Sequence, residues 1–226
     1  YYVWQRLALK GRYSWFAPEY TPKGEEIVEN RTRGKTRDAF FSDLSTVFRR
    51  IHQKLRPGGL LAFSFHHADA EGTVWEGLLQ SLCETGYEIA AVYPVHSESE
   101  TSSHHQDKEN ISYDLIQVCR KRSEDPTPRS WAGVRQEVRR RARAELAAIE
   151  AGRYGGKPLA EPDVRLVCIG KCLELYSAHY GHVLDHEGKP LPLHGALQDI
   201  SAIVDQLVTR ERPLPAELEN IDNLSY

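Results

Sequence analysis

The sequence predicts a mixed α/β protein in which a small sheet, with a parallel strand pair and an antiparallel closing strand, precedes a mainly helical region. Three observations support this prediction. A continuous apolar run at 60–65 follows a Pro-Gly-Gly turn, as in a strand covered by helices on both faces. Two strand-like segments, 87–95 and 113–121, follow a helical pattern at 71–85. Beyond the last strand, apolar residues recur at helical spacing.

The segment before the first strand is expected to contain two helices joined by a long loop. Residues 1–10 have helical character, and 11–35 form a loop rich in proline and glycine. From Thr36 onward, apolar residues lie on one helical face until the turn at 57–59. We expect Gly59 in this turn to need a positive φ, and we expect a β-branched residue there to be destabilising.

Composition divides the chain into two domains. Residues 1–122 form the α/β domain, and the stretch "RSEDPTPRS" supplies a linker at 123–130. Residues 131–226 form a helical accessory domain. Its three helices are expected at 130–151, 163–180 and about 193–208.

Charge and cysteine usage narrow the class of protein. The 226 residues have a net charge of −3, so any nucleic-acid surface must be local. No apolar run approaches the roughly 20 residues that cross a bilayer, so we expect no membrane association. The four cysteines lie in apolar patterns, which favours reduced thiols and a cytoplasmic location. The chain contains no methionine and begins in an uncapped helical pattern, so we expect the natural protein to extend upstream of Tyr1.

A helix, the stretch "LRPGGLLAFSF", a second helix, a strand, a long loop and a strand follow one another. This order resembles the C-terminal half of a class I S-adenosylmethionine-dependent methyltransferase, whose sheet is Rossmann-like. In that fold the Pro-Gly-Gly turn leads into the fifth strand, and the sixth and seventh strands form the closing antiparallel hairpin.

A narrower resemblance rests on four stretches: "YYVWQRLALK", "FFSDLSTVFRRIHQKLRPGGLLAFSFHHAD", "WEGLLQSLCETGYEIAAVYPVHSE" and "ELYSAHYGHVLDHEGKPL". Together they resemble the adenine-specific DNA methylases that carry a domain of unknown function. The resemblance implies S-adenosylmethionine as methyl donor, adenine in DNA as acceptor and DNA as partner. In that family a donor-binding loop and an Asp-Pro-Pro-Tyr motif precede the segment matching "YYVW". Neither is present in this chain, so we assign no catalytic residue and expect the fragment to be inactive alone.

Two alternatives stay open. The chain can be a non-catalytic DNA- or partner-binding module of a split or degenerate methyltransferase. It can also belong to a methyltransferase acting on another acceptor, because the fold serves many substrates.

Candidate substrate-binding residues follow from position. The carboxyl ends of parallel strands line the ligand crevice of open α/β sheets, and two histidines end the first strand. The polar loop between the last two strands and the aromatic N-terminus can approach a flipped base. The residues concerned are Tyr1, Tyr2, His66, His67, Ser97, Glu98 and Asn110. The structural alternatives are a helix cap at the histidines, a solvated loop, and core packing of the N-terminal helix, above all of Trp4.

Four cations without an evident intrachain partner, Arg31, Arg33, Lys35 and Arg37, are expected to contact DNA phosphates. A helical row formed by Arg135, Arg139 and Arg143, with Arg140 beside it, can do the same, although a solvated helix face explains it better.

Cys168, Cys172, His179 and His182 invite comparison with a zinc site. Their spacing fits no standard structural site, and both cysteines fall on the apolar face of a helix. We therefore expect no metal.

Overall fold

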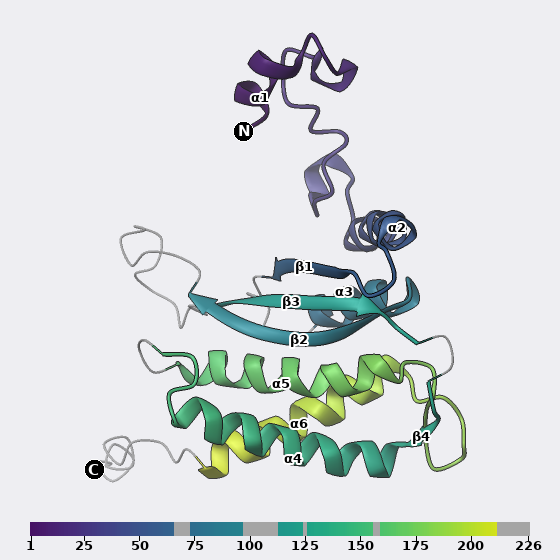
Figure 1. Ribbon diagram of the computed structural model, residues 1–226, viewed down its shortest axis with the longest axis vertical. Coiled ribbons are helices and arrows are strands. Elements are labelled where there is room, and N and C mark those ends of the chain that lie inside the picture. Colours follow the sequence, from purple (N-terminus) through teal and green to yellow (C-terminus); the bar gives the residue numbers. More distant parts are fainter. Residues whose placement is uncertain (66–72, 97–112, 124–125, 156–158, 212–226) are drawn as a thin grey trace, which may run out of the picture. The chain divides into compact units, whose positions relative to one another are not determined.

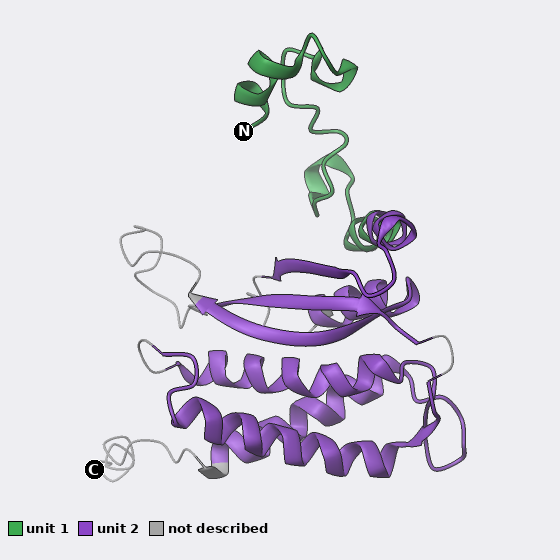
Figure 2. Ribbon diagram, in the orientation of Figure 1, with its two compact units in different colours: residues 1–46 green, residues 47–226 purple. Residues whose placement is uncertain are grey.

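The computed structural model describes residues 1–65, 73–96, 113–123, 126–155 and 159–211 (Figure 1). The chain divides into two compact units, Tyr1–Thr46 and Val47–Tyr226 (Figure 2). None of the described helices is both long enough and apolar enough to cross a membrane.

The first unit is a set of short elements held by side-chain contacts with backbone carbonyls. It comprises α1 (Tyr2–Leu9), two 3-10 turns, Ser14–Phe16 and Arg31–Arg33, and the first half of α2 (Arg37–Lys54). The Tyr2 ring stacks on Phe16, and its hydroxyl donates to the carbonyls of Trp15 and Pro18. No residue of α1 is buried, so these contacts replace a hydrophobic core.

The second unit contains a three-stranded sheet with the order β1-β3-β2 (Figure 1). Its strands are β1 (Leu60–Phe65), β2 (Tyr87–His96) and β3 (Tyr113–Lys121), and α3 (Thr73–Glu84) connects the first two. Both ladders are antiparallel. Strands β1 and β2 therefore run in the same direction but do not pair, because β3 lies between them. The predicted parallel strand pair is wrong on this point, whereas the β2–β3 antiparallel hairpin is present.

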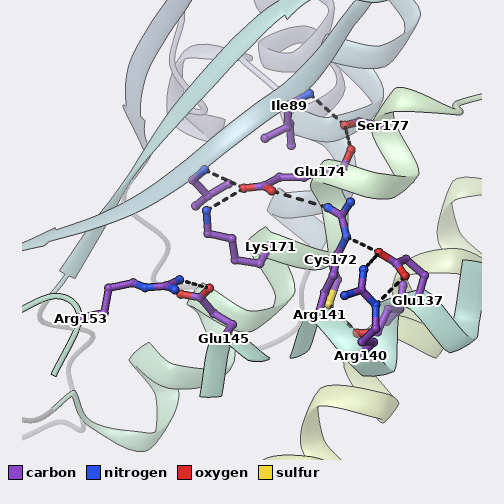
Figure 3. A network of polar contacts seen from close by, with 12 residues as sticks. Ile89, Glu137, Arg140, Arg141, Glu145, Arg153, Lys171, Cys172, Glu174 and Ser177 are labelled. Atoms are coloured by element: carbon purple, nitrogen blue, oxygen red, sulfur yellow. Dashed lines mark hydrogen bonds and ion pairs between the residues drawn. The ribbon is translucent and has the colours of Figure 1, made fainter. Parts of the chain in front are cut away.

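Helix α5 explains why β3 occupies that position. This helix (Glu161–Ala178) covers the outer edge of β2. The Ile89 amide donates to Ser177 Oγ at 2.9 Å, and the Val92 amide donates to Glu174 Oε1 at 3.0 Å (Figure 3). An edge strand closed in this way cannot accept a further strand on that side, so β3 returns on the side facing β1.

Helices α4 (Trp131–Glu150) and α6 (Leu193–Glu211) complete the helical layer around α5 (Figure 1). The apolar residues that recur at helical spacing in the first of these form its buried face, and they are Val134, Val138, Ala142, Leu146 and Ile149. Two short strands, β4 (Arg129–Ser130) and β5 (Val183–Leu184), form a parallel pair. Strand β4 directly precedes α4 in the chain, and β5 follows α5.

The sheet and these helices share one core. Gly170 of α5 lies so close to the sheet that a Cβ atom there would be 3.0 Å from Val92 Cγ1. On the sheet, Phe48 of α2 packs 5.7 Å from Phe63 and 6.3 Å from Tyr87, measured between ring centres. All of these elements from Val47 onward belong to the second compact unit.

Candidate functional site

The sheet topology defines one edge as the candidate substrate site. Strand β1 ends at Phe65 and β2 ends at His96, while β3 begins there at Tyr113. The register confirms that these ends lie at the same edge, because Phe65 pairs with Leu115 and His96 pairs with Tyr113. In open α/β sheets the ligand crevice lies outside the carboxyl ends of strands that run in the same direction.

Five of the sequence-predicted residues follow or precede this edge directly in the chain. They are His66, His67, Ser97, Glu98 and Asn110, and all five lie outside the described residues. Strand β1 ends directly before residues 66–72 in the chain, and β2 ends directly before residues 97–112.

Four aromatic side chains lie at or near this edge, beside Pro94, Val95, Asp114 and Leu115. Phe65 packs edge-to-face against Trp75 of α3, with ring centres 5.0 Å apart, and Tyr113 is almost fully buried. Tyr93 is half exposed, and the Lys171 ammonium lies 5.3 Å from its ring centre. Trp75 and Tyr113 are buried, so Phe65, which is partly exposed, and Tyr93 are the rings named here that can stack on a planar group. Sequence reasoning did not single out Tyr93, because it occurs in an ordinary strand pattern.

The two N-terminal tyrosines have different surroundings. Tyr1 is fully exposed, whereas the ring and hydroxyl of Tyr2 hold the 14–18 segment in place. Trp4 is 76% exposed, so the alternative of core packing for this residue is wrong. Helix α1 thus presents an exposed apolar surface that the short first unit has no core to bury.

The basic loop has partners that the sequence did not reveal. Three guanidinium groups face two glutamates: Arg31 lies 3.7 Å and Arg37 3.1 Å from Glu29, and Arg33 lies 3.7 Å from Glu26. The Lys35 ammonium donates to the Glu26 carbonyl. The premise that these four cations are unpartnered is therefore wrong. Glu25, Glu26 and Glu29 reduce the local net charge from +4 to +1.

The arginines of the helical row differ in their surroundings: two lie near acidic side chains, and two line a groove. Arg135 lies 3.9 Å from Asp199, and Arg140 contacts Glu137 at 2.6 Å. Arg139 and Arg143 line a groove of about 340 Å³, together with Ile203 and Leu207 of α6. Part of the row is thus tied within the helical layer.

A network of ion pairs and hydrogen bonds joins α4, α5 and β2 (Figure 3). Glu137 accepts from Arg140 and Arg141, and the hydrogen bond from Arg140 is the main reason that its pKa falls to about 2. Glu174 accepts from Lys171 at 2.9 Å and faces Arg141 at 3.7 Å. These charges satisfy one another, so we interpret the network as a structural clamp.

The cysteines are buried and do not form a metal cluster with the histidines. The Cys172 thiol lies 3.6 Å from the Val138 carbonyl, and burial raises its pKa to about 12. His179 Nδ1 contacts the Thr127 carbonyl at 3.1 Å. Within the described ranges, no three His, Cys, Asp or Glu residues are grouped to hold a metal ion. A thiol of this pKa is not a nucleophile near neutral pH.

Comparison of the chain with family models, curated proteins and solved structures returned no match. Any functional conclusion therefore rests on the sheet edge and its chemistry.

Proposed function

We propose that the chain is the acceptor-side portion of an S-adenosylmethionine-dependent methyltransferase that acts on the exocyclic amine of adenine in DNA. One observation supports this most: β1 and β2 run in the same direction and end at the same edge of the sheet, directly before the predicted residues His66, His67, Ser97 and Glu98 in the chain. This is the arrangement in which an α/β sheet places a ligand. The order of turn, strand, helix and hairpin matches what the sequence resemblance implies.

The proposed chemistry asks little of the acceptor side. Methyl transfer to an amine depends on positioning the acceptor in line with the donor methyl group. A flipped base is held by stacking and by hydrogen bonds to its edge. Phe65, which is partly exposed at the end of β1, is the proposed stacking residue, and His66 and His67 are the proposed hydrogen-bonding groups.

The methyl donor does not fit the described residues. The glycine pair beside a strand, Gly58 and Gly59, precedes β1 and therefore lies at the opposite edge from the carboxyl ends. In this proposal the residues that bind the methyl donor come from outside the 226 residues.

The test uses the product of the complete gene that encodes this chain. Incubation with S-adenosylmethionine and duplex DNA, followed by mass spectrometry of the nucleosides, should detect N6-methyladenine. His66→Ala and His67→Ala should lower the methylation rate by about tenfold or more, the loss typical of a mispositioned acceptor. Glu187→Gln, in an exposed turn, is the matched control. Methyl transfer only to cytosine, RNA or protein would replace the acceptor class. DNA binding without transfer would favour the non-catalytic module.

The basic loop provides a second arm for the DNA partner. Replacement of Arg31, Arg33 and Arg37 by Ala should weaken binding to all DNA sequences alike. The slope of log affinity against log salt falls by about 0.9 for each phosphate that the protein no longer neutralises. Because all three arginines face glutamates, we expect the triple substitution to remove fewer than three phosphate contacts. An unchanged slope would place the DNA surface elsewhere.

A further inference from the structure

A pocket of about 310 Å³ lies in the second unit, at the edge of the sheet opposite the candidate substrate site. Lys121, the last residue of β3, pairs with Tyr87, the first residue of β2, and so marks that edge. The lining side chains come from α2, the end of β3 and the segment after α5. A volume of this size lies at the small end of the range for small-molecule sites.

The described lining of this pocket is basic. Four of its described members are basic side chains: His52, Lys121, Arg122 and His182. Glu124 and Asp125, which stand between the lining residues Ser123 and Pro126 in the sequence, lie outside the described residues. Burial, reinforced by the charges of Lys121 and Arg122, lowers the pKa of His52. Two charged groups, Lys121 and Arg122, and two imidazoles thus line one small volume in a protein with a net charge of −3.

Part of the pocket is rigidly held. The Arg122 guanidinium donates to the carbonyls of Tyr87 and Cys83, at 3.1 and 3.0 Å, and lies 5.3 Å from the centre of the Tyr180 ring. Two of its five N–H donors are therefore used within the protein, which fixes the position of its charge. His182 is fixed through its backbone, which donates to the His179 carbonyl and accepts from the Arg129 amide.

Other donors remain available. The Lys121 ammonium and the Tyr180 hydroxyl make no hydrogen bond or ion pair with another residue in the described part of the chain. Ser123 adds a hydroxyl to the same lining. The pocket therefore offers an ammonium, two hydroxyls and two imidazoles beside a fixed guanidinium. This set of groups suits an anion that has several acceptor oxygens.

We infer that this pocket binds a phosphomonoester, with Lys121, Ser123, Tyr180 and His182 around the phosphate oxygens and Arg122 contributing charge. A phosphomonoester bears close to two negative charges and three strong acceptor oxygens near neutral pH. A carboxylate offers one charge and two oxygens and would leave donors unused. The site is separate from the proposed methyl-transfer edge and does not depend on it.

Isothermal titration calorimetry on the 226-residue chain tests this inference. The probes are inorganic phosphate, a nucleoside 5′-monophosphate, and an oligodeoxynucleotide with or without a 5′-phosphate. Phosphate-dependent binding is expected, so the unphosphorylated oligonucleotide should bind more weakly than its phosphorylated counterpart. Tightest binding of the nucleotide would identify a small molecule as the source, and tightest binding of the phosphorylated oligonucleotide would identify a nucleic-acid end.

Lys121→Gln and His182→Gln should each weaken phosphate binding by about tenfold, the effect of removing one hydrogen bond to a charged group. Both side chains are partly exposed, and thermal melting by circular dichroism should show that the variants stay folded. Lys23→Gln removes the same charge from the first unit and should leave binding unchanged. Absence of binding at millimolar phosphate would overturn the inference. So would equal displacement by sulfate, or equal affinity in the Lys121→Gln and Lys23→Gln variants.

Discussion

The turn before β1 contains two adjacent glycines, Gly58 and Gly59, which are required for different physical reasons. The Gly59 amide donates to the Arg56 carbonyl at 2.9 Å, which closes a four-residue turn with Pro57 and Gly58 at its centre. Gly58 has φ +73° and nothing within 4 Å of the place where a Cβ would lie. Proline followed by a residue near φ +80° is a type II turn. Gly58 is therefore required by its backbone conformation.

Gly59 is required by space. A Cβ atom there would be 2.9 Å from the Arg56 carbonyl oxygen and 2.7 Å from Leu55 Cδ1, closer than side-chain carbons approach such atoms. Leu55 can move, but the Arg56 carbonyl is held by the turn hydrogen bond. The sequence-based expectation of a positive φ at Gly59 is wrong, since the positive φ belongs to Gly58.

Different substitutions should distinguish these causes. An L-residue in the left-handed region costs about 1–2 kcal/mol, less for Asn, so Gly58→Ala should cost about 1 kcal/mol and Gly58→Asn less. Gly59→Ala should cost about 1–3 kcal/mol by crowding, and Gly59→Val more. The corresponding decrease in Tm is about 2–4 °C per kcal/mol for a chain of this size.

Urea unfolding followed by circular dichroism gives these free energies. Leu55→Ala in the Gly59→Ala background should recover only part of the crowding cost, because the clash with the Arg56 carbonyl remains. If Gly59→Asn were tolerated and Gly58→Asn were not, the assignment of the two causes would be refuted.

Three further outcomes follow from the second unit. Gly170→Ala should lower Tm by crowding the sheet, whereas Gly195→Ala, with no contact closer than 3.9 Å, should raise stability by up to about 1 kcal/mol; both are measured by thermal melting. Gln117→Met should stabilise by about 1–3 kcal/mol in urea titration, since the buried amide lacks a hydrogen-bond partner among the described residues. The pKa of Glu137 is about 2, so the stability that its ion pairs contribute is present above about pH 4.5 and disappears toward pH 2. Glu137→Gln should remove about 1 kcal/mol of this pH-dependent stability, measured by acid titration of unfolding. An unchanged pH profile in this variant would contradict the prediction.

Local patterns predicted the elements well because local physics sets them. The strand expected at 60–65 is β1 (Leu60–Phe65), and the one expected at 113–121 is β3 (Tyr113–Lys121). Apolar runs bounded by turn residues determine such segments. The order of strands was not predictable in this way, because it depends on α5 covering the edge of β2 from some 80 residues further along the chain.

Partners distant in the sequence also limited the functional predictions. The charge of Arg33 was visible, but its approach to Glu26 depends on how the 25–37 segment folds back. The phosphate pocket is a stronger example, since His52, Lys121 and His182 come from three separate elements and no motif joins them. Sequence reasoning identified the candidate edge because strand direction alone determines it.

The two outer strands of the sheet differ in a way that bears on the proposed function. Side chains of α5 satisfy the outer amides of β2, but no described strand pairs with the outer edge of β1, and Leu60 is 61% exposed. An open apolar edge promotes pairing with another chain. The 226-residue chain should therefore self-associate in sedimentation experiments, and Ala62→Lys on the exposed face of β1 should reduce this without lowering Tm. In the complete gene product, a donor-binding segment paired with β1 should slow amide exchange along 60–65. Equal exchange in the two proteins would argue against a shared sheet and, with it, against the proposed arrangement of donor and acceptor sides.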